Sequence, residues 1–152
     1  MKATDFLKKQ HKEVMGLFEE VLGAEDPESR RQLCEKIEQE LKVHTKIEEE
    51  IFYPAVKELG GKGEEMVMEA LEEHHVVDLV LAELPEVDPE DERFEAKMTV
   101  LQELVQHHAK EEEKEMFKTA QRIGKTELDE LGERLEARTG ELKGEMGAAE
   151  AA

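Results

Sequence analysis

Six residues of this 152-residue chain combine imidazole and carboxylate side chains at spacings that suit a metal site. Within each of two pairs, a glutamate follows a histidine by four residues, so on a helix the pair presents both side chains on one face. Four imidazoles and two carboxylates around one cavity suit two hard-to-borderline divalent or trivalent ions. The candidate ligands are His11, His44, Glu48, His74, His108 and Glu112.

Each candidate ligand stands where a hydrophobic seam of 3,4 spacing would otherwise continue. His11 falls between Leu7 and Val14, and His74 falls between Ala70 and Val77. Such a seam faces partner helices, so these side chains are expected to point into a bundle. Burial without partners costs roughly 1–3 kcal/mol per polar group. A shared metal centre is the simplest way to satisfy them, and the alternative is a buried polar network in which two carboxylates serve four imidazoles.

Composition limits the classes of partner and the compartment. The net charge of -19 argues against binding to nucleic acid or to an anionic membrane, since either needs a basic face. No run of about 18 apolar residues is long enough for a membrane span, and the first residues lack the apolar stretch of a signal peptide. We therefore expect a cytoplasmic protein. The single cysteine, Cys34, lies on the second seam and is interpreted as a buried hydrophobe.

The elements that must position these ligands are helices. There is no Trp and one Tyr, which is typical of helical rather than sheet proteins. Asp26 followed by Pro27 predicts a helix start, and Pro54 should kink or end the helix that contains it. Four helices are expected over residues 4–22, 26–59 and 64–84 and from Asp88 onward.

The chain is internally doubled. HTKIEEEIF from His44 matches HAKEEEKEMF from His108, and His74 follows His11 by a similar interval. The pattern predicts an all-α fold, an antiparallel up-down-up-down four-helix bundle over residues 1–124. Residues 125–152 are expected to form a short amphipathic fifth helix with a frayed tail.

With these motifs in order, the sequence resembles the hemerythrin-like, or HHE cation-binding, family of non-haem di-iron proteins over about residues 4 to 120. The resemblance rests on the first histidine, then HTKIEEEIFYP, EEHH and HHAKEEEKEMF. It implies a hemerythrin-like bundle with two iron ions joined by an oxo or hydroxo bridge. It also implies that each of the four histidines binds one ion and that Glu48 and Glu112 bridge both.

Two departures separate the chain from the oxygen carriers of that family. Oxygen-carrying members typically place a second histidine four residues after the first on the third helix, where this chain has Asp78. The last carboxylate, Glu112, follows its histidine by four residues instead of five. Four histidines, two bridging carboxylates and one bridge leave about two of twelve coordination positions free on two six-coordinate irons. The differences favour variants of the family that react with peroxide or nitric oxide.

Two interpretations of function remain open. The first is a di-iron oxidoreductase, catalase-like or peroxidase-like, that reacts with hydrogen peroxide, with nitric oxide or with both. The second is a protein without turnover, which binds oxygen reversibly, holds iron or acts as a sensor module. The sequence predicts a small-molecule oxidant as partner and does not identify a reductant, a protein partner or an oligomeric state.

Residues near the candidate ligands have more than one interpretation. Tyr53 follows Glu48 by five residues and either reaches one iron or its bridge, as a catalytic group, or packs beside Pro54 with its hydroxyl at the surface. His75 and His107 adjoin two ligands, but neighbouring residues on a helix diverge by about 100°, so we expect outer hydrogen-bonding or surface roles. The EEE runs at 48–50 and 111–113 are expected to be solvated, with one glutamate of each turned inward.

Overall fold

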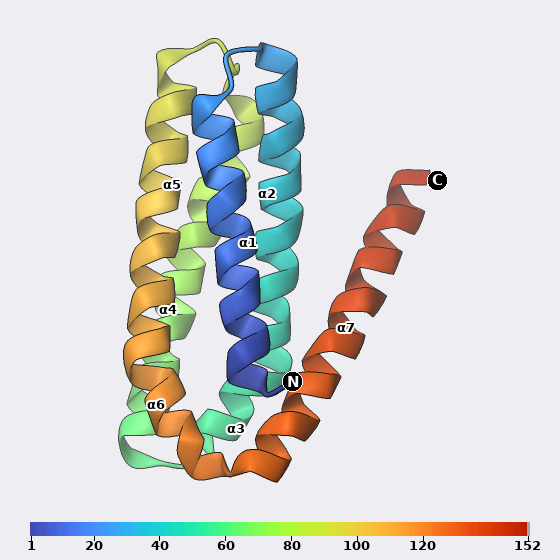
Figure 1. The fold of residues 1–152 in the computed structure, drawn as a ribbon. Coiled ribbons are helices and arrows are strands. Elements are labelled where there is room, and N and C mark those ends of the chain that lie inside the picture. Colours follow the sequence, from blue (N-terminus) through green and yellow to red (C-terminus); the bar gives the residue numbers. More distant parts are fainter. Residues whose placement is uncertain (152) are drawn as a thin grey trace.

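In the computed structural model, residues 1–151 are described, with side chains through residue 148, and their secondary structure is entirely helical. Four long helical columns run antiparallel to one another, and a fifth helix leaves the bundle at an angle (Figure 1). The predicted up-down-up-down bundle with a C-terminal helix is confirmed. Its elements are α1 (Ala3–Gly23), α2 (Pro27–Ile47), η1 (Glu48–Phe52), α3 (Tyr53–Lys57), α4 (Gly61–Glu83), η2 (Leu84–Glu86), α5 (Glu92–Glu111), η3 (Glu112–Met116), α6 (Phe117–Ala120), η4 (Gln121–Ile123) and α7 (Lys125–Ala151).

Aspartates cap the starts of α2 and α5. Asp26 accepts a hydrogen bond from the Ser29 backbone N–H at 3.1 Å, as its place before Pro27 predicts. The predicted start of the fourth column at Asp88 is wrong, because Asp88 accepts from the Glu90 N–H and closes a turn. Asp91 caps α5 instead, accepting from the Arg93 N–H at 2.9 Å.

The second column, α2 to α3, and the fourth column, α5 to α6, each contain a π-helical segment of five residues. These segments, η1 and η3, begin at Glu48 and Glu112. A π turn closes i→i+5 hydrogen bonds and is uncommon outside functional sites. Pro54 therefore does not end its helix: the widened turn of η1 precedes it and the chain continues as α3 to Lys57.

The core consists of two hydrophobic clusters separated by a polar layer. One cluster, with Phe18, Ile37 and Leu101, fills the end of the bundle at which α1 joins α2, and Cys34 is buried in it. The other surrounds Phe52 at the opposite end. The six candidate ligands are buried and interrupt the apolar seams at intermediate positions, so they occupy the layer between the clusters.

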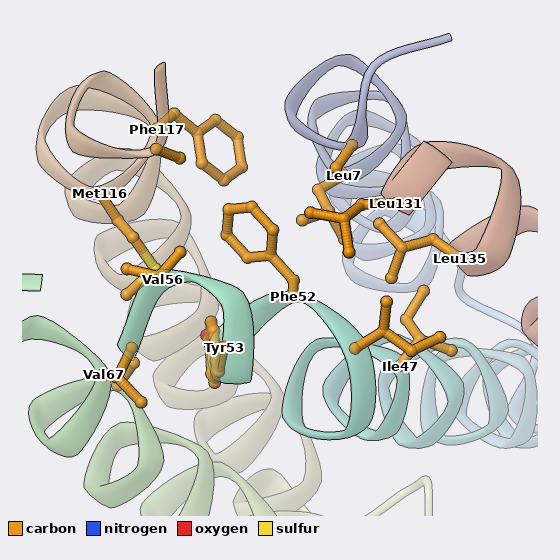
Figure 2. Close-up of a cluster of buried hydrophobic side chains, with 14 of the residues drawn as sticks. Leu7, Ile47, Phe52, Tyr53, Val56, Val67, Met116, Phe117, Leu131 and Leu135 are labelled. Atoms are coloured by element: carbon orange, nitrogen blue, oxygen red, sulfur yellow. The ribbon is translucent and has the colours of Figure 1, made fainter. Parts of the chain in front are cut away.

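The fifth helix, α7, packs against the first half of the bundle. In Figure 2, Leu131 and Leu135 of α7 lie near Leu7 and Ile47, with Phe52 beside them. The C-terminal segment therefore shares a core with residues 1–124. The helix is 27 residues long and continues to Ala151 through the segment expected to fray, of which residue 152 lies outside the described part.

Candidate metal centre

All four columns contribute to one buried layer of histidines and glutamates. The structure brings together the six residues that the sequence singled out, and each is less than 9% exposed. The ligands come from α1 (His11), α2 (His44), η1 (Glu48), α4 (His74), α5 (His108) and η3 (Glu112).

The donor atoms form two adjoining groups. His11, His44, Glu48 and Glu112 offer donors within 4.8 Å of one another, and Glu48 also forms a group with His74 and His108. Both carboxylates reach both groups. Glu48 Oε1 lies 3.1 Å from His44 Nε2 and 3.2 Å from His74 Nε2, and Glu112 lies 3.2 Å from the Nε2 atoms of His11 and His108.

The Tyr53 hydroxyl lies at the centre of the second group. It donates to Glu112 Oε2 at 2.6 Å and lies 3.1 and 3.3 Å from the Nε2 atoms of His74 and His108. The side chain is 1% exposed, which excludes a surface position for the hydroxyl. In an uninterrupted α-helix, five residues would turn Tyr53 about 140° away from Glu48. The wider turn of η1 brings both onto one face.

Phe117 occupies the equivalent position in the second half. It follows Glu112 by five residues, as Tyr53 follows Glu48, and its ring stacks on His11 at 6.1 Å. The Tyr53 ring stacks on His74 at 5.3 Å. The two donor groups therefore have similar aromatic walls, but only the group of His74 and His108 has a hydroxyl at this position.

An outer ring of oxygen atoms orients all four imidazoles. Each histidine Nδ1 lies 2.7 to 2.8 Å from a side-chain oxygen that accepts its hydrogen bond. Because Nδ1 donates outward, Nε2 points at the centre and, once deprotonated, offers a lone pair to a metal. The acceptors are Glu113 for His11, Gln10 for His44, Glu49 for His74 and Glu73 for His108.

Sequence reasoning missed these four acceptors. One glutamate of each EEE run is buried, as expected, but the partly solvated Glu49 and Glu113 also accept hydrogen bonds from histidines of the centre. The internal doubling carried a signal: Gln10 and Glu73 directly precede His11 and His74, and Glu49 and Glu113 directly follow Glu48 and Glu112. Only contacts between helices reveal which imidazole each one reaches.

Electrostatics favour protonated histidines when no metal is bound. Burial alone lowers the pKa of His11, but the hydrogen bonds and charges of Glu112 and Glu113 outweigh it and raise this pKa to about 9. The same balance with Glu48 and Glu49 raises the pKa of His74 to about 9, and carboxylates raise that of His108 to about 11. A metal ion must therefore displace protons from these side chains.

The pKa values of the Glu48 carboxyl and the Tyr53 phenol shift in opposite directions. Burial alone would raise the pKa of Glu48, but the charge of His44 and nearby hydrogen bonds hold it well below its usual range. Burial and the charges of Glu112 and Glu48 raise the pKa of Tyr53 well above its usual range. The metal-free centre thus combines an ionised Glu48 carboxylate with a protonated Tyr53 phenol.

The donor set fits metal ions better than it fits a hydrogen-bonded network. Two donors about 2.1 Å from one ion and 90° apart are about 3 Å from each other, close to the observed His–Glu distances. Four of the buried donor atoms have no hydrogen-bond partner. An ion would satisfy these atoms, which otherwise carry a desolvation cost. They are His11 Nε2, His44 Nε2, Glu48 Oε2 and Glu112 Oε1.

Two openings of opposite charge approach the layer. A groove of about 380 Å³ between α1 and α5 reaches His11 past Lys8, Lys12 and Lys110. A cavity of about 30 Å³ between α4 and the fourth column reaches His108 and Glu112, and its other walls include four further glutamates. Asp78, at the position of the fifth histidine in oxygen carriers, is exposed and outside the layer, as are His75 and His107.

Comparisons with known proteins agree with this geometry. The sequence profile of the hemerythrin HHE cation binding domain matches residues 2–120. The chain is similar to Rv2633c, an uncharacterized protein of Mycobacterium tuberculosis, with 33% identity over 147 residues that cover 95% of this chain and 89% of that protein. A DNA nickase of Nostoc sp. is 26% identical over 117 residues, which cover 77% of this chain and 33% of the nickase.

A solved structure has the same fold. It is the crystal structure of a hemerythrin HHE cation binding domain-containing protein from Mycobacterium kansasii, described as a homolog of Rv2633c. The TM-score is 0.85 at 27% identity, over 95% of this chain and 89% of that one. Among the described residues, no helix is long and apolar enough to cross a membrane.

Proposed function

Because this chain belongs to the hemerythrin HHE cation-binding domain family, we propose that its centre holds two iron ions and that the loaded protein reacts with small oxidants. The preferred reactant is hydrogen peroxide, in catalase-like turnover, and nitric oxide is the second. The observation that supports this most is the pair of carboxylates, each within 3.2 Å of histidines from both donor groups. Such sharing suits two neighbouring ions, joined in this proposal by an oxo or hydroxo bridge.

The protein supplies ligands and orientation, and the ions supply the reactive chemistry. Iron bound at these donors contributes Lewis-acid and redox activation of an oxygen species. The four outer acceptors hold each imidazole with Nε2 inward, so the ligands are arranged before metal binds. Residues of the two hydrophobic clusters exclude bulk water from above and below the layer.

Tyr53 is the residue to which we assign the tuning of reactivity. Its distances of 3.1 and 3.3 Å from the Nε2 atoms of His74 and His108 match the spacing of neighbouring ligands, which supports a place beside an ion held there, either as a ligand or as a hydrogen-bond donor. Its 2.6 Å hydrogen bond to Glu112 Oε2 holds the phenol proton next to the reacting region. A positioned proton donor of this kind contributes about 10²–10⁴-fold to a rate.

An ion held by His11 and His44 would then keep a free coordination position for the reactant. Phe117, which lies where Tyr53 lies in the other half, has no oxygen to occupy it. The exposed position of Asp78 also removes a candidate fifth side-chain ligand from the layer. Such a position would admit peroxide, whereas reversible oxygen carriage in the family uses an additional histidine at the position of Asp78.

The proposal is tested with protein expressed in iron-replete medium. We expect about two irons per chain by metal analysis, charge-transfer bands in the near ultraviolet and visible, and oxygen release on addition of peroxide. One tightly bound zinc without iron would contradict the di-iron assignment. A reversible oxygen adduct with no oxygen release from peroxide would replace turnover by oxygen binding, and iron retained without either reaction would favour iron holding or sensing.

A further inference from the structure

A second histidine–carboxylate cluster lies on the surface beside the centre. Glu73 of α4 and His107 and Glu111 of α5 each offer one donor atom, and the three atoms lie within 4.8 Å of one another. His107 Nε2 is 3.1 Å from Glu111 Oε2 and 3.7 Å from Glu73 Oε2. The imidazole is 73% exposed, so a solvated cation reaches it directly.

Glu111 carries a mark of an unsatisfied metal ligand. Its Oε2 atom is shielded from solvent and has no hydrogen-bond partner, although the His107 ring nitrogen lies only 3.1 Å away. His11 Nε2 and Glu112 Oε1 in the buried centre show the same combination of close approach and missing hydrogen bond. A cation between imidazole and carboxylate satisfies both groups, which suits borderline divalent ions of the first transition row.

The surface cluster and the centre share the walls of one cavity. Glu73 and Glu111 line the outer part, and His108 and Glu112 line the inner part. The cavity volume of about 30 Å³ exceeds the roughly 10–15 Å³ that one water molecule needs, so a small ion fits. Glu73 connects the two sites directly: Oε1 accepts from His108 Nδ1 at 2.7 Å while Oε2 faces His107.

We propose that Glu73, His107 and Glu111 bind a divalent cation from solvent and that the adjoining cavity delivers Fe²⁺ from this site to the buried centre. The first part stands on the cluster alone, and the delivery step rests on the proposed iron function. The other approach is the groove lined by Lys8, Lys12, Lys110 and Glu113, whose net positive charge disfavours cations. The charge of the two openings therefore directs cations to the α4–α5 side.

Binding at the surface site is tested with Co²⁺ added to the iron-loaded protein and followed by its visible absorption and by calorimetry. Wild type is expected to bind one further ion, and His107→Ala or Glu111→Gln should weaken that binding about tenfold or more. Glu115→Gln is the matched control, because it removes the same charge from the same cavity without removing a donor of the cluster. Identical titrations for wild type and His107→Ala, or equal weakening by Glu115→Gln, overturn the site.

Delivery is tested by mixing metal-free protein with Fe²⁺ under nitrogen and following metal uptake in time. His107→Ala and Glu111→Gln are expected to slow loading about tenfold and to leave the final iron content unchanged. His75→Ala, which removes the other exposed histidine that adjoins a buried one, should load at the wild-type rate. Equal rates in all variants overturn delivery. A failure of every protein to hold iron contradicts the proposed function, and the surface site is then tested on the iron-free protein, where His107→Ala should bind one Co²⁺ fewer than wild type.

Discussion

Residues 3–57 and 61–120 place matching donors at matching positions, but Tyr53 in the first half corresponds to Phe117 in the second. Each ring stacks on a histidine of the centre, so packing alone does not require the difference. The difference matters instead for the centre, because the Tyr53 hydroxyl lies within 3.3 Å of four donor atoms. Two nearly symmetric donor groups therefore differ in their surroundings by one oxygen atom.

The halves also differ in what covers them. Ile47 and Ile51 of the first half lie under α7, whereas the residues that correspond to them in the second half are Glu111 and Glu115. The glutamates line the small cavity that reaches the centre. One side of the centre is thus closed by the apolar face of α7, and the equivalent side is open and acidic. The duplicated unit has been adapted on one side for enclosure and on the other for access.

The largest expected effect is loss of the centre when either half loses a ligand. His108→Ala should remove most of the bound iron, because Nε2 of His108 faces the centre, whereas His107→Ala should keep about two irons per chain at saturating iron. Metal analysis after desalting measures both. If the His107 variant is empty and the His108 variant is full, the assignment of this helix face is wrong.

Tyr53→Phe makes the two halves alike at the position that distinguishes them. It removes only the hydroxyl, so we expect both irons to remain, the visible spectrum to shift and the peroxide rate to fall by up to about 10²–10⁴-fold. Phe117→Tyr provides the converse, by adding a hydroxyl beside His11. An unchanged spectrum and rate in Tyr53→Phe would leave this residue with a packing role only.

The pH dependence of stability tests a property that both halves share, namely buried histidines with a raised pKa. Histidines with a raised pKa stabilise the metal-free protein fully below the unfolded value of 6.5, and this contribution is lost as pH rises through about 9 for His11 and His74 and about 11 for His108. Metal binding must displace the same protons, so it strengthens over that range. The gap in melting temperature between loaded and metal-free protein should therefore widen from pH 6.5 to 9. A constant gap would contradict proton displacement.

The smallest expected effect is on stability alone, and it tests the cover on the first half. Leu135 of α7 is fully buried against the bundle, so Leu135→Ala should lower the free energy of unfolding of the metal-free protein by about 2–5 kcal/mol. Met66→Ala, on the open side and only partly buried, should cost less. Urea unfolding of both variants decides whether α7 is part of the core, since equal small losses would make it a dispensable attachment.

The sequence by itself determined the four-helix bundle, the fifth helix and the six residues that meet in the polar layer. This was achievable because 3,4 spacing is a local property of an α-helix, and because a histidine or glutamate on an apolar seam requires a partner. The order of the motifs then indicated the family. Asp26 was identified as a cap for the same local reason, whereas Asp88 and Asp91 both suit capping and only the folded turn selects Asp91.

Tertiary structure decided the direction of Tyr53, the outer hydrogen bonds and the charge of the two openings. A π turn is locally unfavourable and is maintained by the contacts it permits, so the α-helical periodicity of the sequence could not place Tyr53 beside Glu48. Glu49, Glu73 and Glu113 read as solvated residues along their own helices, and they acquire a role only through imidazoles on neighbouring columns. Which half is covered depends on where α7 packs, and this is set by the apolar surface that α7 buries against residues distant in the sequence.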